Sequence, residues 1–205
     1  GCATLRALPI PAALNAFYGI GCAAFTDPNY NNLANAQSLD ENEWSGTTKL
    51  AFRISEEVMT YASYARGYKA GGFNLDRVRI GSPRTSTPNL DTHFDKELVD
   101  SYELGLKTQW AGNTLLLNAS LFYQDYEDFQ LNTFDGVQFL VTSLEEVISQ
   151  GLDLDIVWFT PLEQLSIQGG VTYAETEIED PVALANPGLF NPLRENDRLS
   201  FAPEW

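Results

Sequence analysis

Side chains that carry out catalysis are scarce in this chain of 205 residues. His93 is the only histidine, so a zinc site built on two histidines, HExxH included, is excluded, and nothing supports a Ser-His-Asp triad. The string GYKAGG at 67–72 lacks the spacing of a phosphate-binding loop, because its lysine precedes the glycine pair. We therefore predict neither an enzyme nor a bound cofactor.

Two groups of carboxylates offer the hard oxygen ligands that calcium prefers. They are Asp125, Glu127 and Asp128, and Glu175, Glu177, Glu179 and Asp180. Charged strand ends in contact with water account for them as well. Calcium therefore stays an alternative, and the prediction is that the chain has no metal site.

The stretch from 66 to 84 is the one basic patch in an acidic chain. Guanidinium groups bind carboxylate and phosphate through paired hydrogen bonds, so this patch could capture an anionic ligand. The alternative is that the same side chains face lipid phosphates or neighbouring acidic loops. The candidate ligand-binding residues are Arg66, Tyr68, Lys69, Phe73, Arg77, Arg79 and Arg84.

The charge balance excludes one class of partner. Twelve Lys and Arg face 28 Asp and Glu, which gives a formal net charge of -16, so a nucleic-acid partner is not expected. Mean hydropathy is -0.19, which excludes a helical membrane bundle. It does not exclude a membrane β-barrel, because only alternate residues of a barrel strand meet lipid.

The elements that position these side chains show a period of two. The clearest stretches are 44–54, 101–110, 115–124, 151–158 and 165–174. In the first, Leu50 and Phe52 fall on one face while Lys49 and Arg53 fall on the other. Strands of a soluble β-sandwich alternate in the same way, so the period predicts strands without choosing the surroundings.

The connections between the strands favour a transmembrane barrel. Tight turns are predicted near 55–57, 111–113 and 160–163, whereas the connections at about 69–96 and 177–197 are far longer than hairpin loops. Trp110 and Trp158 stand beside tight turns, as in the aromatic girdle of a membrane barrel. We predict an all-β fold, a partial antiparallel transmembrane β-barrel of about seven strands, with short periplasmic turns and long extracellular loops. The expected strands are 44–54, 58–68, 98–110, 114–131, 137–157, 164–177 and 198–205.

The first 43 residues are predicted to be an extracellular loop. Residues 7–26 carry no charge, but their prolines and glycines argue against a continuous helix. Cys2 and Cys22 are the only cysteines, and a pair in an exported protein is most simply a disulfide. The barrel segment is then expected to span 44–205.

Several strings in this order resemble the barrel of TonB-dependent outer-membrane receptors, especially the siderophore-receptor-like branch. They are YASYARGYKAGGFN at 61–74, DSYELGLKTQW at 100–110, LNASLFYQDYEDFQLNTF at 117–134, SQGLDLDIVW at 149–158, LSIQGGVTYAETEI at 165–178 and RLSFAPEW at 198–205. The resemblance implies a fragment of a larger barrel, truncated at both ends, in the outer membrane of a Gram-negative bacterium.

The same resemblance implies partners and a function. It implies outer-membrane lipid and lipopolysaccharide around the barrel, a plug domain through which the TonB complex acts, and a small-molecule substrate, most simply a ferric siderophore. The basic patch would then help capture an anionic iron chelate. The alternatives are a passive porin-type or small structural barrel, and a soluble carbohydrate-binding β module.

Overall fold

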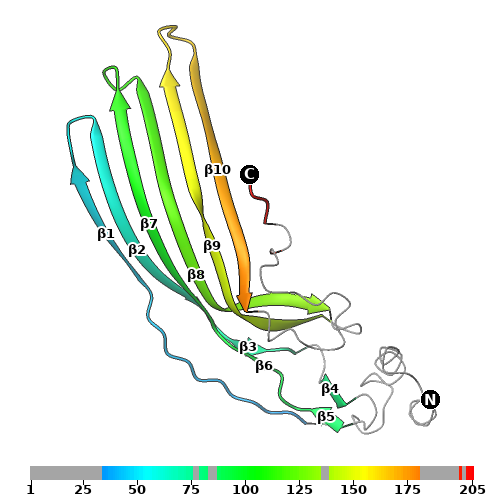
Figure 1. Ribbon diagram of the computed structural model, residues 1–205. Coiled ribbons are helices and arrows are strands. Elements are labelled where there is room, and N and C mark those ends of the chain that lie inside the picture. The colour runs from blue at the N-terminus through cyan, green and yellow to red at the C-terminus, as the bar shows by residue number, and fades with distance from the viewer. Residues whose placement is uncertain (1–33, 76–78, 83–86, 135–138, 181–198, 200–201) are drawn as a thin grey trace.

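The computed structural model describes residues 34–75, 79–82, 87–134, 139–180, 199 and 202–205. Six strands form one curved antiparallel sheet in the order β1-β2-β7-β8-β9-β10 (Figure 1). Their bounds are Gly46–Arg53 for β1, Val58–Lys69 for β2, Glu97–Trp110 for β7, Leu115–Phe134 for β8, Phe139–Phe159 for β9 and Ser166–Asp180 for β10. Six of the seven predicted strands are thereby confirmed.

One face of this sheet is apolar and lies open. The register places Leu50, Ala62, Leu104, Leu121 and Leu152 side by side on five successive strands. Leu104 is 56% exposed and Ile167 is 45% exposed, so neither packs in a closed core. Because successive side chains of a strand alternate between faces, the predicted period of two yields this apolar face.

Aromatic rings border the apolar face at both ends. Trp110 and Trp158 lie in one cross-strand row beside the tight turns. Tyr64, Tyr102 and Tyr123 form the other row, with ring centroids 5.2 and 6.4 Å apart. The eight residues of strand between the rows span about 27 Å, or roughly 20 Å at the usual barrel tilt, which is comparable with the ~25 Å apolar band of outer-membrane barrels.

The opposite face is polar and is packed by interlocking side chains. Lys49 lies 3.6 Å from the centre of the Tyr61 ring, and the Tyr61 hydroxyl donates to Glu103. Tyr61 is buried over Gly105 of the neighbouring strand, where a Cβ would collide with its ring. At Gly151 a Cβ would collide with the backbone carbonyl oxygen of Tyr173, at 1.9 Å, and with the Phe122 ring, at 2.7 Å. Glycine is therefore required at these two positions so that an aromatic ring can cross the strand.

Three tight turns join the strands at one end, which we call the tight-turn end. Ile54 N donates to Val58 O at 2.9 Å, which closes the first turn. Ala111, Gly112 and Asn113 all have positive φ, at 52°, 68° and 69°, so the second turn is tightly coiled. The predicted tight turns are confirmed, and so is the long connection between β2 and β7. At that same end, however, β8 and β9 are joined by residues 135–138 alone, and most of the long connection expected at 177–197 lies outside the described residues.

The opposite end, which we call the loop end, is more structured than expected. The long connection between β2 and β7 contains two small ribbons. One pairs β3 (Gly72–Phe73) with β6 (His93–Phe94), and the other pairs β4 (Arg79–Ser82) with β5 (Thr87–Asn89). A loop of this length gains order by pairing its own backbone groups.

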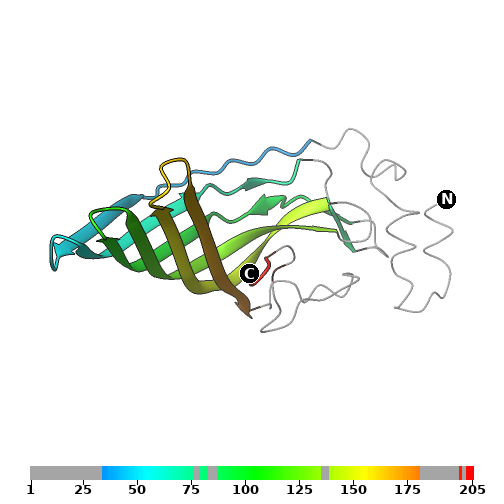
Figure 2. The ribbon, with the colours of Figure 1, turned by 90° about the horizontal axis from the view of Figure 1, so that it is seen from above.

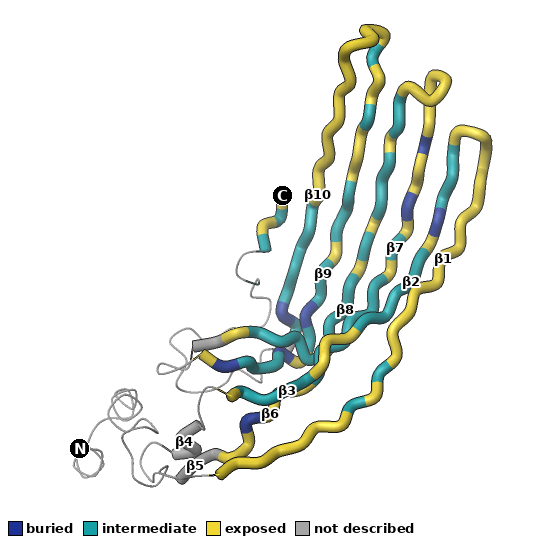
Figure 3. The backbone as a smooth tube through the Cα atoms, turned by 180° about the vertical axis from the view of Figure 1, so that it is seen from behind, coloured by how far each residue is buried: buried dark blue, intermediate teal, exposed yellow. Residues whose placement is uncertain are grey.

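The long strands β8 and β9 change direction at the loop end. Asp128 has a φ of 54°, and beyond it the hairpin turns away from the rest of the sheet (Figures 1 and 2). At the bend, Leu144, Val147 and Ile178 form a fully buried apolar cluster against Tyr126 and Phe129. Figure 3 shows buried positions of β9 and β10 close together there. This cluster holds the bent hairpin against β10.

The segment expected as a seventh strand lies partly outside the described residues. Residues 202–205 have no strand assignment, but Ala174 N on β10 donates to Glu204 O at 2.9 Å. The rings of Tyr173 and Trp205 are 4.9 Å apart. Residues 202–205 therefore lie against β10 and pair with it at one point. Cys2 and Cys22 also fall outside the described residues, and in the described ranges no helix is long and apolar enough to cross a bilayer.

The contact between Tyr61 and Gly105 provides a test of the packing. Replacing Gly105 by leucine should destabilise the folded protein by about 1–3 kcal/mol, because the added side chain displaces the Tyr61 ring. Urea unfolding followed by tryptophan fluorescence measures the change. Adding Tyr61→Ala to the variant should restore much of the lost stability.

Gly169→Ala is the matched control, because the nearest atom to its new Cβ is Ile156 Cγ2 at 3.8 Å. It should unfold like the wild type. Equal destabilisation by Gly105→Leu and Gly169→Ala would contradict the proposed packing of Tyr61 on Gly105.

Candidate functional site at the loop end

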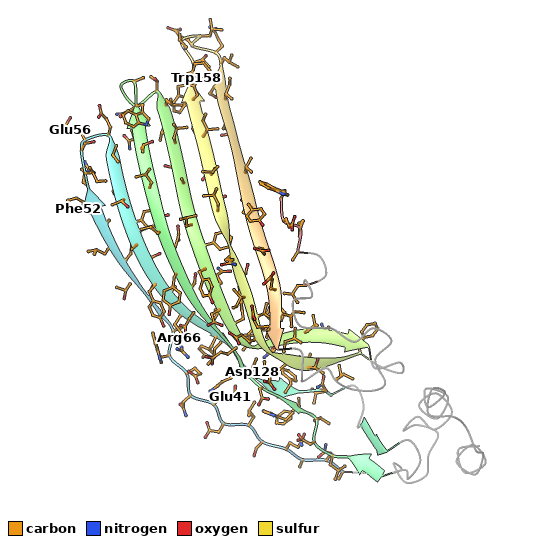
Figure 4. The ribbon with its side chains drawn as sticks, in the orientation of Figure 1. Glu41, Phe52, Glu56, Arg66, Asp128 and Trp158 are labelled. Carbon is orange, nitrogen blue, oxygen red and sulfur yellow. The ribbon has the colours of Figure 1, made fainter. Side chains whose placement is uncertain are left out.

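An extended segment at 34–45, called the strap, lies along the connection between β2 and β7. Asn35 Nδ2 donates to Leu90 O at 2.8 Å, and Gln37 Oε1 accepts from Thr92 Oγ1 at 2.7 Å. The backbone N–H of Gly71 donates to Glu41 Oε2 at 3.0 Å. Figure 4 places Glu41, Arg66 and Asp128 at this end and Glu56 and Trp158 at the other. The strap thus fixes the loop from one side.

A charge pair fastens the same strap nearer to the sheet. The Lys96 ammonium donates to Glu43, and this cation lowers the pKa of the Glu43 carboxyl. The carboxylate in turn raises the pKa of Lys96. Both groups are charged at neutral pH, which keeps the strap and the connection together there.

An asparagine fixes the loop from the other side. Asn74 Nδ2 donates to Val141 O at 3.0 Å, and Val141 N donates to Asn74 Oδ1 at 2.7 Å. The side-chain amide therefore pairs with β9 as another strand would. The backbone N–H of Asn74 also donates to Thr92 O at 2.7 Å. Because Asn74 follows β3 and Thr92 precedes β6, both strands of this ribbon are tied to the bent hairpin.

A polar pocket of about 290 Å³, which we call the mouth pocket, lies between the β3–β6 ribbon and the bent hairpin. Its lining includes Asn74, Asp91, His93, Asp95, Asp128 and Glu145. Burial raises the pKa of the Asp128 carboxyl, and the nearby charges of Asp95 and Glu127 raise it further. His93 Nδ1 is 3.7 Å from Asp95 Oδ1. The pocket is thus rich in acceptors and suits a ligand that donates hydrogen bonds.

The structure separates the predicted ligand-binding residues. Arg66 lies on the same face as the tyrosine row, where it pairs with Asp100 at 3.1 Å. Its guanidinium carbon is 5.4 Å from the centre of the Trp44 ring, and Tyr64 donates to Asp100 at 2.6 Å. Tyr68 follows on that face and is 48% exposed. Arg66 and Tyr68 therefore point away from the polar face.

One other member of the predicted set, Phe73, lies beside the mouth pocket. The Phe73 ring packs edge-on against His93 with centroids 6.1 Å apart, so it stands beside the pocket. Lys69 Nζ is 4.0 Å from Glu97 Oε2. Arg79 opens β4, but its side chain is not described, and Arg77 and Arg84 lie outside the described residues. The structure thus brings Phe73 to the pocket and leaves the arginines of the loop as predictions.

The carboxylates considered for calcium do not converge. Asp125 lies level with Asp100 of β7, while Asp128 lines the mouth pocket. Within the described ranges, no three His, Cys, Asp or Glu side chains are grouped so that they could hold a metal ion.

Sequence reasoning missed the residues that build the mouth pocket. Asn74 belongs to the string KAGGFN, but its partner Val141 is 67 positions away, so nothing local reveals the pairing. Asp128 was visible only as part of an acidic run. Its backbone bend, with positive φ, has no glycine to signal it.

Replacing Lys96 by alanine should loosen the strap at neutral pH. Because the folded pKa of Glu43 lies below its ordinary 4.5, the Glu43 contribution is present above pH 4.5 and is lost as pH falls through the lowered value. Hydrogen–deuterium exchange in 34–45 should therefore be faster in Lys96→Ala at pH 7. The difference from the wild type should vanish at a pH below the lowered pKa of Glu43.

Lys107→Ala removes the same charge near the tight-turn end and should leave exchange in the strap unchanged. Identical exchange of the strap in wild type and Lys96→Ala at pH 7 would show that the ion pair does not hold it.

Comparison with known proteins identifies the family. The family model described as TonB dependent receptor-like, beta-barrel, matches residues 23–205. Among solved structures, the ferric yersiniabactin uptake receptor FyuA from Yersinia pestis is similar over 78% of this chain, with 23% identity and a TM-score of 0.52. The ferric-catecholate import receptor Fiu from E. coli is similar over 72%, with 21% identity and a TM-score of 0.49.

This chain spans about a fifth of each of these structures, 21% of the first and 20% of the second. In a barrel of this family, the apolar face meets lipid and the polar face lines the interior. The family consists of outer-membrane transporters of Gram-negative bacteria and not of enzymes. The chain therefore belongs to the TonB-dependent receptors, and its six strands form part of their outer-membrane β-barrel.

Proposed function

We propose that the protein containing this chain takes up a ferric siderophore across the outer membrane with energy from the TonB complex. A plug domain outside this chain would make the TonB contact. Outer-membrane lipid and lipopolysaccharide would surround the barrel. The acidic net charge of -16 gives no reason to expect a nucleic-acid partner.

The observation that carries the proposal is the continuous polar face. It runs from Lys107 near the tight-turn end, through Tyr61 and Glu103, to the loop end. Two of its carboxylates accept hydrogen bonds, Glu103 from Tyr61 and Asp153 from Thr172 at 2.6 Å. Such a wall suits the aqueous interior of a barrel, where a hydrated solute or a polar plug can contact it.

Carboxylates and arginines both occur in the sequence of the connection between β2 and β7. The mouth pocket carries carboxylates, which would repel an anionic chelate. The connection that contains β4 and β5 carries Arg77, Arg79 and Arg84 in sequence. An anionic ferric chelate is therefore expected to bind these arginines and not the mouth pocket, because guanidinium groups bind carboxylates through paired hydrogen bonds.

The fold comparison supports the same substrate class. One structure that is similar with a TM-score of 0.52 is a receptor for ferric yersiniabactin. At 23% identity that likeness concerns the fold, so it indicates which class of solute to test first and does not identify the chelate.

Removing the arginines together should weaken binding of an anionic ferric siderophore. Each lost charge-assisted contact weakens binding by about tenfold, so Arg77→Ala with Arg79→Ala and Arg84→Ala should reduce affinity at least about tenfold in the full receptor. Quenching of intrinsic fluorescence by the ferric chelate gives the affinity. Arg53→Ala, at the tight-turn end, is the matched control and should bind as the wild type does. Unchanged affinity in the triple variant would remove these arginines from the binding site.

Energy dependence separates this proposal from a passive porin-type barrel. Uptake of radiolabelled iron chelate into cells carrying the full receptor should stop when TonB is deleted, while chelate binding to the cells persists. Uptake that continues at the same rate without TonB would favour passive diffusion through the barrel.

A further inference from the structure

The lipid-facing surface of the sheet contains a groove of about 700 Å³ near the tight-turn end. It crosses β7, β8, β9 and β10, between the tryptophan row and the row of Leu104 and Leu121. Its walls are the large side chains of Leu106, Trp110, Leu117, Leu154, Ile156 and Val171. A volume of this size lies in the range of small-molecule sites.

Three small residues create the hollow. Thr108, Ala119 and Gly169 occupy lipid-facing positions where their neighbours on the same face carry leucine, isoleucine or valine. Ala119 stands between Leu106 and Leu154, and Gly169 stands opposite Ile156. The surface is therefore hollow at the small side chains and raised at the bulky ones, because the two kinds alternate from one strand to the next.

Two lipid-facing side chains of the groove, Thr108 and Trp110, carry polar groups, and these are already paired, whereas Asn118 and Asp155, which also line it, belong to the polar face. Thr108 is only 6% exposed, and its Oγ1 donates to Leu117 O at 2.8 Å and accepts from Trp110 Nε1 at 2.9 Å. The hydrogen bond from Trp110 holds the indole against its own strand, where the indole forms a wall of the groove. An apolar occupant would leave neither of these groups without its hydrogen bond, and a polar occupant would find no free partner in them.

We infer that this groove is a binding site for an acyl chain of a phospholipid of the periplasmic leaflet. The groove lies within the apolar band that family membership places in the bilayer, so it is continuous with the lipid interface. It lies on the side of the tight turns, which face the periplasm in this family, and the Trp110 row stands at headgroup level. An acyl chain in the groove lies below this headgroup level and contacts Leu117, Ile156 and Val171 along its two sides. This site is independent of the transported substrate.

The site can be filled without disturbing the backbone. A Cβ at Gly169 meets only Ile156 Cγ2, at 3.8 Å, and φ there is not positive, so a larger side chain fits into open space. Ala119 already carries a Cβ that faces the groove. Ala119→Leu combined with Gly169→Leu therefore replaces the hollow by side-chain atoms. Gly46→Leu is the matched control, since Gly46 lies on the same face outside the groove and its nearest neighbour is Trp44 at 3.8 Å.

The experiment uses the full receptor in vesicles that contain a phosphatidylethanolamine with a photoactivatable group on one acyl chain. After irradiation, cross-linked peptides are quantified. Labelling should concentrate in 106–119 and 154–171. It should saturate as the proportion of the photoactivatable lipid is raised, and it should decrease when unlabelled phosphatidylethanolamine competes. Labelling should fall by about tenfold in the double variant, because about two methylene groups of the acyl chain lose their contacts. The Gly46→Leu control should label like the wild type.

Three outcomes would overturn the inference. Labelling spread evenly along the apolar face, including the Leu104 and Leu121 row, with no saturation in the wild-type receptor, would indicate ordinary bulk lipid. The double variant could label as strongly as the control. Cross-links through the groove to a second receptor copy, in place of lipid, would assign the groove to a protein interface. The saturation measurement needs only the wild-type receptor, so it decides the question even if the double variant fails to fold.

Discussion

The structure depends on one constraint, which is that a chain in hydrocarbon must satisfy its backbone hydrogen bonds internally. Within the sheet the strands meet it by continuous antiparallel pairing from β1 to β10, while the outer edges of these two strands have no strand partner in the described part of the chain. Pairing of this kind fixes the register, and the register decides which side chains face lipid. A shift by one residue would exchange Leu104 and Leu106 for Glu103 and Lys107 on the lipid side, at a cost of several kcal/mol for the buried charges.

Different side chains stabilise the two faces of the sheet. On the lipid side, leucine rows lie between tryptophan at one level and tyrosine at the other, so the sheet is anchored at both headgroup layers. On the polar side, Tyr61 and Phe122 lie across Gly105 and Gly151 and lock neighbouring strands together. Past the membrane band, where water is again available, β8 and β9 bend at Asp128 and the apolar cluster around Val147 takes over the stabilisation.

Much of the fold follows from the sequence, because period two is a local signal. The strands and tight turns were predicted within a few residues, and the same alternation could have placed Arg66. The strand β2 continues to Lys69, so Arg66 shares the face of Tyr64 and points away from the polar face. The prediction of one basic loop over 66–84 overlooked that residues 66–69 continue the alternation of β2.

The site was less predictable, because its contacts join residues far apart in the chain. The pairing of Asn74 with Val141, and that of Glu43 with Lys96, depends on how long connections fold over the strand ends. No periodic pattern encodes such contacts. The bend at Asp128 is likewise set by the cluster beneath it and not by a turn residue.

The central claim is that alternate residues of one strand face lipid and the barrel interior. Spin labels placed one at a time along 103–107 of the full receptor in vesicles test it directly, through collision with oxygen, which concentrates in lipid, and with a water-soluble nickel complex. The account predicts oxygen accessibility at Leu104 and Leu106 and nickel accessibility, or immobilisation, at Glu103 and Lys107. Equal accessibility at all positions, or the opposite phase, would contradict it.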